Sequence, residues 1–214
     1  MDFGAFHKEI SKGEMYPEYI RVPTLILSNW VFQCILYMDR TERAFKILLD
    51  LILAVILYFG FTPYSAPIPA LILSISSAHT INWVFNGQIF VLLKNLRLTE
   101  IEQEYFISYA DGLQRRINGK KSILFAAIFG SLSRDELRKS SDLDVRIIRR
   151  QGVVNGFRSC LFALMERSQA FLLRFPLDIY VLDDLQSLSK LREDEVPVVL
   201  YDPEKLVGEY EQWR

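Results

Sequence analysis

The chain has 214 residues, 50% of them hydrophobic, and a formal net charge of −1. This length allows one ordinary domain with an accessory element, or two small domains, and the balanced charge argues against bulk nucleic acid as a partner. The hydrophobic residues are concentrated in one stretch, which indicates a membrane-associated segment beside a soluble domain.

The N-terminal segment, residues 1–43, has mixed charge and no apolar core followed by small residues, so it does not resemble a secretory signal. Within it, residues 22–38 are apolar but interrupted by Pro23, and they are short for a membrane span. We interpret them as a helix at the membrane interface, with Trp30 and Tyr37 near the lipid headgroups. A third membrane crossing is the alternative.

A long uncharged stretch follows. Residues 51–93 contain no Lys, Arg, Asp or Glu, which is enough chain for two crossings of a hydrocarbon core about 30 Å thick. Prolines near its middle predict two helices, at 44–61 and 68–93, joined in a transmembrane hairpin over residues 44–94. Two helices buried in a soluble core are the alternative, but a domain this small would hardly surround helices that are apolar on nearly all sides.

Charges at the ends of this hairpin predict its orientation. They are Arg40, Arg43 and Lys46 before the first helix and Lys94 and Arg97 after the second, whereas the turn carries none. The positive-inside rule therefore predicts a multi-pass protein of the cell membrane, with both termini and the soluble domain in the cytoplasm.

Polar residues interrupt the second predicted helix. His79, Asn82 and Asn86 recur at i, i+3 and i+7, so they share one helix face. Hydrogen bonds within the hairpin, or between the subunits of a homo-oligomer, are one interpretation. The other is a recognition site for a lipid or another membrane-borne acceptor. Asp50, in the first helix, is expected to form an ion pair with Lys46, four residues earlier.

The soluble domain is expected over residues 99–214. Thr99 and Glu102 form a capping-box pattern that predicts a helix to about Ile117. Hydrophobic patterns then predict strands at 122–129, 142–149, 177–182 and 196–201, a short helix from about Leu132 and a longer helix at 154–171. The predicted fold class is therefore mixed α/β (α+β) with a mixed sheet.

The first predicted strand ends at Gly130 and Ser131, where the short helix is expected to begin. Glycine lets the backbone approach a phosphate closely, and the start of a helix offers free N–H groups and the positive end of its dipole. The hydroxyl of Ser131 adds a further donor. This pattern predicts a cradle for the phosphates of a nucleoside triphosphate.

Three acidic residues indicate a divalent cation. Asp142 and Asp144, two positions apart on a predicted strand, share a face where their repulsion is costly unless a cation lies between them. Mg²⁺ is the natural cation because it prefers carboxylate and phosphate oxygens, and Mn²⁺ is the alternative. Asp178, between apolar residues of a later predicted strand, would complete a clamp of two metal ions.

These residues resemble the signature of the minimal nucleotidyltransferases of the DNA polymerase beta superfamily, which reads Gly-Ser, then Arg-Gly-Glu, then Ser-Asp-x-Asp, with a third Asp on a later strand. The matching residues are Gly130, Ser131, Arg134, Glu136, Ser141, Asp142, Asp144 and Asp178. Asp135 departs from the pattern, because it stands where the family usually has glycine. The resemblance covers about residues 99–205 and implies the nucleotidyltransferase fold.

The resemblance also implies a role for each matching residue. Gly130, Ser131, Arg134, Glu136 and Ser141 would bind the nucleotide, Asp142 and Asp144 would bind both metal ions, and Asp178 would bind one ion and take the proton of the acceptor. A nucleoside monophosphate would pass from the triphosphate to the acceptor, with release of pyrophosphate. Three arginines, Arg146, Arg149 and Arg150, continue the second strand and would meet the triphosphate, anionic lipid or solvent.

The whole sequence thus predicts a membrane-anchored nucleotidyltransferase that acts on a lipid, a lipid-linked sugar or a membrane protein, because an anchored domain meets such acceptors at high effective concentration. One alternative is a non-catalytic, nucleotide-binding membrane regulator, which the extra negative charge of Asp135 favours. The other is a transferase that acts on a soluble small molecule.

Overall fold

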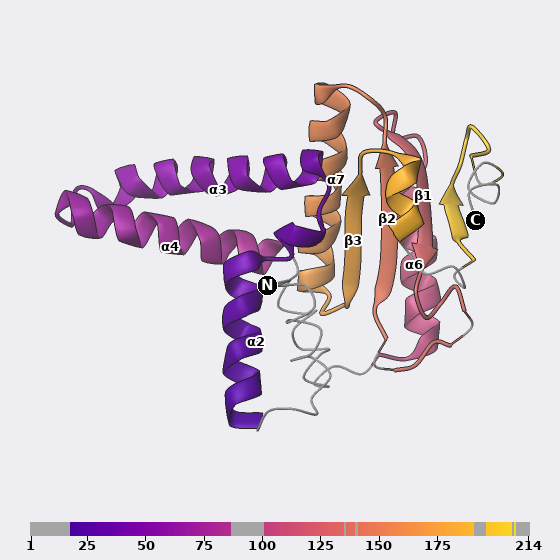
Figure 1. Cartoon of the computed structure of the whole chain (residues 1–214), viewed down its shortest axis with the longest axis horizontal. Coiled ribbons are helices and arrows are strands. Elements are labelled where there is room, and N and C mark those ends of the chain that lie inside the picture. The colour runs from indigo at the N-terminus through magenta and orange to yellow at the C-terminus, as the bar shows by residue number, and fades with distance from the viewer. Residues whose placement is uncertain are drawn as a thin grey trace.

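The computed structural model of the chain describes residues 18–86, 101–134, 136–139, 141–190, 196–206 and 208. In this part, a four-stranded sheet and its helices form one layered unit. Two long helices, α3 (Arg40–Phe61) and α4 (Pro67–Phe85), project from one edge of it (Figure 1).

The sheet is mixed, as the sequence predicts. Its strands are β1 (Ile123–Phe129), β2 (Leu143–Arg149), β3 (Leu177–Leu182) and β4 (Val198–Tyr201), in the spatial order β3-β2-β1-β4. β1 runs antiparallel to β2 and β4, whereas β2 and β3 are parallel. The mixed α+β class is therefore confirmed.

Two helices cover one face of the sheet, α6 (Gln103–Ile117) and α7 (Val153–Leu172), and α7 is also the crossover between the parallel strands β2 and β3. The period-two alternation of β2 explains how this face forms, because Leu143, Val145 and Ile147 all point into the core beneath the helices. The residues between them, Asp144 and Arg146, consequently lie on the opposite face.

That opposite face carries a second, smaller apolar cluster. Phe125 and Phe129 from β1 pack there with Tyr180 from β3. The cover comes from Met38 and from two short 3₁₀ helices, η1 (Ile35–Tyr37) and η2 (Leu185–Lys190). This face therefore holds the acidic residues of the strands, and the chain that leads into α3 lies over part of it.

The hairpin helices expose their apolar side chains along most of their length. In the most apolar 18-residue stretch of each helix, only 6% of the residues of α3 and 22% of those of α4 are buried. Side chains such as Ile56 and Phe59 are exposed. Both helices are long and apolar enough to cross a membrane. The second helix, predicted to reach residue 93, ends at Phe85, and residues 87–100 lie outside the described part.

The apolar segment predicted at residues 22–38 is helical as α2 (Glu18–Phe32), with Pro23 inside the helix. It ends earlier than the apolar pattern, because Gln33 and Cys34 adopt positive φ angles of 45° and 57° that break the helix before η1. In Figure 1, α2 runs across the axis of the hairpin close to its base rather than alongside α3 and α4.

Two predicted helix features differ in the structure. The N-cap of α6 is Glu102, which makes no side-chain capping hydrogen bond, and its expected partner Thr99 lies outside the described residues. The helix expected from about Leu132 is wrong, because residues 131–134, 136–139 and 141 form turns and irregular backbone.

Candidate active site

The two acidic strand residues meet across the parallel pair of strands. Asp144 in β2 and Asp178 in β3 are register partners, so their side chains leave the same face of the sheet side by side. Asp142 directly precedes β2. The structure thus places all three predicted carboxylates at one end of β2 and β3.

Gly130 lies at the end of β1, next to the Asp144 carboxylate. Its neighbour Phe129 is the register partner of Asp144, and Gly130 itself has a φ of +74°. A Cβ atom at Gly130 would overlap the Oδ2 atom of Asp144. Glycine is required here twice, for the left-handed backbone and for the space that the carboxylate fills.

The loop after Gly130 is held by its own short polar side chains. Ser133 Oγ donates to the Gly130 carbonyl oxygen at 2.9 Å, and the Arg138 amide donates to Ser141 Oγ at 3.0 Å. Such side-chain bonds compete with the helical pattern, which explains why no helix forms in the described part of this loop. The helix start that was expected to donate to a phosphate therefore does not form in the described part of this loop.

Ser131 retains the feature expected of a phosphate donor. Its Oγ atom is buried and has no hydrogen-bond partner in the structure, although buried polar atoms are nearly always paired. Arg134 and Glu136, the other nucleotide-binding candidates of the loop, form an ion pair of 3.1 Å with each other. Asp135 lies outside the described residues.

Arg146 lies between the carboxylates. Its Nη2 atom is 3.8 Å from Asp144 Oδ1 and 3.6 Å from Asp178 Oδ2, and its guanidinium stacks over the Tyr180 ring at 4.7 Å. The cation that the sequence analysis assigns to this space is here an arginine side chain. The sequence could have predicted this position, because Arg146 is two residues from Asp144 on the same strand and so lies on the same face of the sheet.

Burial and the neighbouring charges shift the pKa of Asp178 in opposite directions. Burial raises the pKa of Asp178, Arg146 lowers it, and Asp142 raises it further. The oxygen donors of the three acids suit a hard divalent cation such as Mg²⁺. Among the residues that the structure describes, however, no three His, Cys, Asp or Glu side chains are arranged as a metal site, and Arg146 is the cation that neutralises Asp144 and Asp178.

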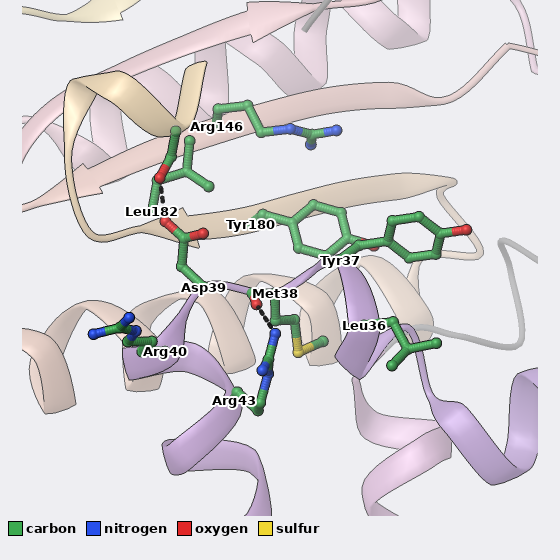
Figure 2. Close-up of a pocket in the computed structure, with 10 residues that line it drawn as sticks. Leu36, Tyr37, Met38, Asp39, Arg40, Arg43, Arg146, Tyr180 and Leu182 are labelled. Carbon is green, nitrogen blue, oxygen red and sulfur yellow. Dashed lines mark hydrogen bonds between the residues drawn. The ribbon is translucent and has the colours of Figure 1, made fainter. Parts of the chain in front are cut away.

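A cavity of about 480 Å³ adjoins this arginine. The cavity residues are Leu36, Tyr37, Met38, Asp39, Arg40, Arg43, Arg146, Tyr180, Leu182 and Ser187. Figure 2 shows Arg146 and Tyr180 on the sheet side and the chain from Leu36 to Arg43 on the other side. The base of the hairpin therefore forms one wall of a cavity whose other wall is the candidate active-site face.

The same hairpin base is fixed to the edge strand β3 by a buried ion pair that the sequence analysis did not identify. Glu42 in α3 and Arg167 in α7 are 2% and 5% exposed and are bonded to each other. Glu42 also accepts a hydrogen bond from the Val181 amide at 2.8 Å, and Arg167 donates to the Ile179 carbonyl oxygen. The helices thereby pair backbone groups of an edge strand that would otherwise be open.

The polar stripe of α4 faces inward and extends this network. His79 Nδ1 is 3.0 Å from Asp50 Oδ2, and Asn82 donates to Asp50 Oδ1 at 2.6 Å. Asn86 bonds to Asn82 and accepts a hydrogen bond from Arg167 at 3.0 Å. A continuous set of hydrogen bonds therefore runs from the hairpin to the sheet.

The expected ion pair between Lys46 and Asp50 is not formed. Lys46 donates instead to the Gln33 carbonyl oxygen at 2.8 Å, because Asp50 is already bonded to two side chains of α4. Asn82 and Asn86 are buried by contacts within the chain, so the acceptor site and the homo-oligomer contact suggested for this stripe stay predictions.

No match to this chain is found among protein-family models, curated proteins or solved structures. What the chain does must therefore be inferred from the residues of the site and their geometry.

Proposed function

We propose that the chain is a membrane-anchored, metal-dependent nucleotidyltransferase. It transfers a nucleoside monophosphate from a nucleoside triphosphate to a membrane-associated acceptor and releases pyrophosphate. The observation that carries the proposal is the fit of Gly130 against the Asp144 carboxylate, with Asp178 aligned beside it across the parallel strands. Residues up to 48 positions apart in the sequence thus lie together at one end of the strands, which supports the proposal.

In the proposed reaction, an acceptor oxygen bonds to the α-phosphorus while the bond from that phosphorus to the bridging oxygen breaks, and pyrophosphate leaves. Gly130 lets the phosphates approach the backbone, and the unpaired Ser131 Oγ donates to a phosphate oxygen. Asp142, Asp144 and Asp178 would hold one or two Mg²⁺ or Mn²⁺ ions, which neutralise phosphate charge. Asp178 receives the proton when the acceptor is a hydroxyl.

The hairpin is the proposed anchor. At 1.5 Å per residue, α3 and α4 are about 33 Å and 28 Å long, but the part of α3 that exposes large apolar side chains, from Ile47 to Phe61, is only about 22 Å long, against a hydrocarbon core of about 30 Å. Basic residues at the base of α3 favour a cytoplasmic domain. Since α2 runs across the hairpin axis, it would lie at the membrane interface rather than form a third crossing.

One observation favours a second candidate function, the non-catalytic nucleotide-binding regulator. Arg146 already neutralises Asp144 and Asp178, and a protein that needs no metal ion would keep such an arginine in place. Under this reading the chain binds nucleotide without turnover.

The decisive experiment measures label transfer from each of the four α-labelled nucleoside triphosphates in native membranes with Mg²⁺. We expect label in the lipid or protein fraction with the wild type, and a loss of about 100-fold or more in Asp144→Asn, because charge stabilisation at the reacting phosphate is lost. Asp111→Asn, at an exposed acid of α6, is the matched control. Label only in small soluble products would support the soluble acceptor, and nucleotide binding without any transfer would support the regulator.

A further inference from the structure

We propose that the cavity at the hairpin base binds the acceptor, and that the acceptor is a lipid whose headgroup ends in a phosphate monoester. This inference rests on the proposed nucleotidyltransferase function and adds the substrate class to it. It is carried by the position, the charge and the rim of the cavity.

The cavity lies where a lipid headgroup and the carboxylates can meet. Arg43 is four residues before Ile47, the first large exposed apolar side chain of α3, which is about 6 Å along a helix axis. The cavity would therefore sit at headgroup level if the exposed part of the hairpin enters the bilayer. Arg146, which also lines the cavity, is within 4 Å of both Asp144 and Asp178.

The charge of the lining suits a phosphate dianion. Three arginines line the cavity, Arg40, Arg43 and Arg146, with one acid, Asp39. Asp39 already accepts hydrogen bonds from the Asp183 amide at 2.9 Å and from Ser187 Oγ at 2.6 Å.

The two outer arginines remain available to a ligand. Arg43 donates one bond, to the Met38 carbonyl oxygen at 2.9 Å, and Arg40 is exposed and makes no ion pair in the part of the chain that the structure describes. Guanidinium groups bind phosphate oxygens through paired, charge-assisted hydrogen bonds. Arg146 is already shared by Asp144 and Asp178. The excess positive charge offered to a headgroup therefore comes from Arg40 and Arg43 against Asp39.

The rim favours a lipid over a soluble phosphate. Leu36 and Tyr37 line the cavity and are 51% and 56% exposed, so they offer an apolar contact that inorganic phosphate cannot use. Acyl chains that leave the headgroup would continue along these side chains into the bilayer. A volume of about 480 Å³ accommodates a headgroup of a few polar groups.

The reaction follows from where the phosphate binds. An oxygen of the lipid phosphate monoester, whose headgroup Arg40 and Arg43 hold in the cavity, forms a bond to the α-phosphorus of the nucleotide. The bond between that phosphorus and the oxygen bridging to the β-phosphate breaks, and pyrophosphate leaves with the electron pair. The attacking dianion carries no proton on that oxygen, so none is transferred, and the product joins lipid and nucleoside through a phosphoanhydride.

Label transfer to vesicles of defined composition tests the acceptor class. The full-length protein is incubated with α-labelled nucleotide and with vesicles of phosphatidylcholine alone, with added phosphatidic acid or with added phosphatidylglycerol. We expect labelled lipid with phosphatidic acid, which has a phosphate monoester. Labelled lipid with phosphatidylglycerol instead, which has hydroxyls and a phosphodiester, would overturn the proposal and leave the nucleotidyltransferase function intact.

Binding provides a readout that does not depend on turnover. Calorimetry with the detergent-solubilised protein compares dihexanoyl phosphatidic acid, dihexanoyl phosphatidylglycerol and inorganic phosphate. We expect the first to bind most tightly, and the Arg40→Ala, Arg43→Ala double variant to weaken it about 10-fold or more, since charge-assisted hydrogen bonds are lost. Arg158→Ala, at an exposed arginine of α7 outside the cavity, should leave it unchanged.

The outcomes separate the two proposals. Equal affinity for inorganic phosphate and dihexanoyl phosphatidic acid, or equal weakening by Arg158→Ala, would overturn the lipid pocket whether or not transfer is observed. Tight, Arg40- and Arg43-dependent binding without transfer to any acceptor would support the pocket and contradict the nucleotidyltransferase function.

Discussion

The two ends of the helical hairpin are built for different surroundings. Toward the turn, α3 and α4 expose apolar side chains such as Ile56 and Ile68. At the base, the same two helices bury Glu42, Asn82 and Asn86 among hydrogen-bond partners from α7 and β3. The turn end thus exposes an apolar surface, whereas the base is packed as part of the folded domain.

This difference shows that the hairpin is joined to the sheet domain by buried, hydrogen-bonded contacts rather than by a linker. A flexible linker would hold the site near a membrane without orienting it. Here the base of α3 is bonded to β3, the strand that carries Asp178 and Tyr180. The orientation of the hairpin therefore fixes the orientation of the site.

The largest effect is expected at the buried ion pair. Glu42→Ala leaves the Arg167 guanidinium and the Val181 amide without their carboxylate, which should lower the free energy of unfolding by roughly 3–5 kcal/mol. Thermal unfolding of the detergent-solubilised protein measures this loss.

Glu104→Ala, at an exposed position on α6, is the control and should change stability little. Joint replacement of Glu42 and Arg167 by Met should recover part of the loss, since no buried charge then lacks a partner. A destabilisation by Glu42→Ala no larger than that of the control would contradict the docked base.

The next effect concerns the site alone. Gly130→Ala should reduce transfer about 100-fold or more, because the new Cβ displaces the Asp144 carboxylate and small misplacements of reacting groups are costly. Gly119→Ala is a matched control: Gly119 has a similar φ of +79° but open space around its Cβ position. It should cost roughly 1–2 kcal/mol of stability and no activity. Equal activity losses in both variants would point to backbone strain rather than to the carboxylate.

The positions of strands could be predicted where the sequence has a regular apolar pattern. The strands at 177–182 and 142–149 were placed to within a residue because their apolar alternation is clear. The pairing of Asp144 with Asp178 followed, since both lie near the start of their strands. The local structure of the loop after Gly130 could not be predicted from its sequence. Its backbone groups form hydrogen bonds with the side chains of Ser133 and Ser141 instead of forming a helix.

Contacts between distant elements could not be predicted. Glu42 and Arg167 are 125 positions apart, and nothing local to either residue indicates the other. Similarly, Arg146 was expected at a strand end, but its side chain turns toward Asp178 because Tyr180 offers a ring to pack on. Asp50 and Lys46 have the i, i+4 spacing of a helical ion pair, but Asp50 bonds to side chains of α4 instead. Such a local ion pair contributes little stability, so hydrogen bonds to another helix replace it.

A smaller effect should distinguish the base of the hairpin from its turn end. Asn82→Ala removes the hydrogen bonds that Asn82 donates to Asp50 and to the Lys46 carbonyl oxygen and should cost about 1 kcal/mol. Ser74, two turns into α4, is also buried, but its hydroxyl bonds to the Leu71 carbonyl oxygen of its own helix. Ser74→Ala should therefore be near neutral, and unfolding midpoints of both variants in the same detergent measure the difference. Equal costs would show that the polar stripe adds nothing to the packing of the helices.

The last prediction concerns position in the membrane and should change neither stability nor activity. Tyr64 is exposed in the uncharged turn, so Tyr64→Cys, in a background without Cys34 and Cys160, should react in intact cells with a membrane-impermeant maleimide. Arg115→Cys, on α6, should react only after lysis.

The exposed part of α3, from Ile47 to Phe61, is about 22 Å long, shorter than a core of about 30 Å. The turn would reach the far side only if the polar base enters the membrane or the bilayer thins around it. Labelling of Tyr64→Cys only after lysis would therefore mean a hairpin that inserts from the cytoplasmic side without crossing, and the cavity would still lie at headgroup level.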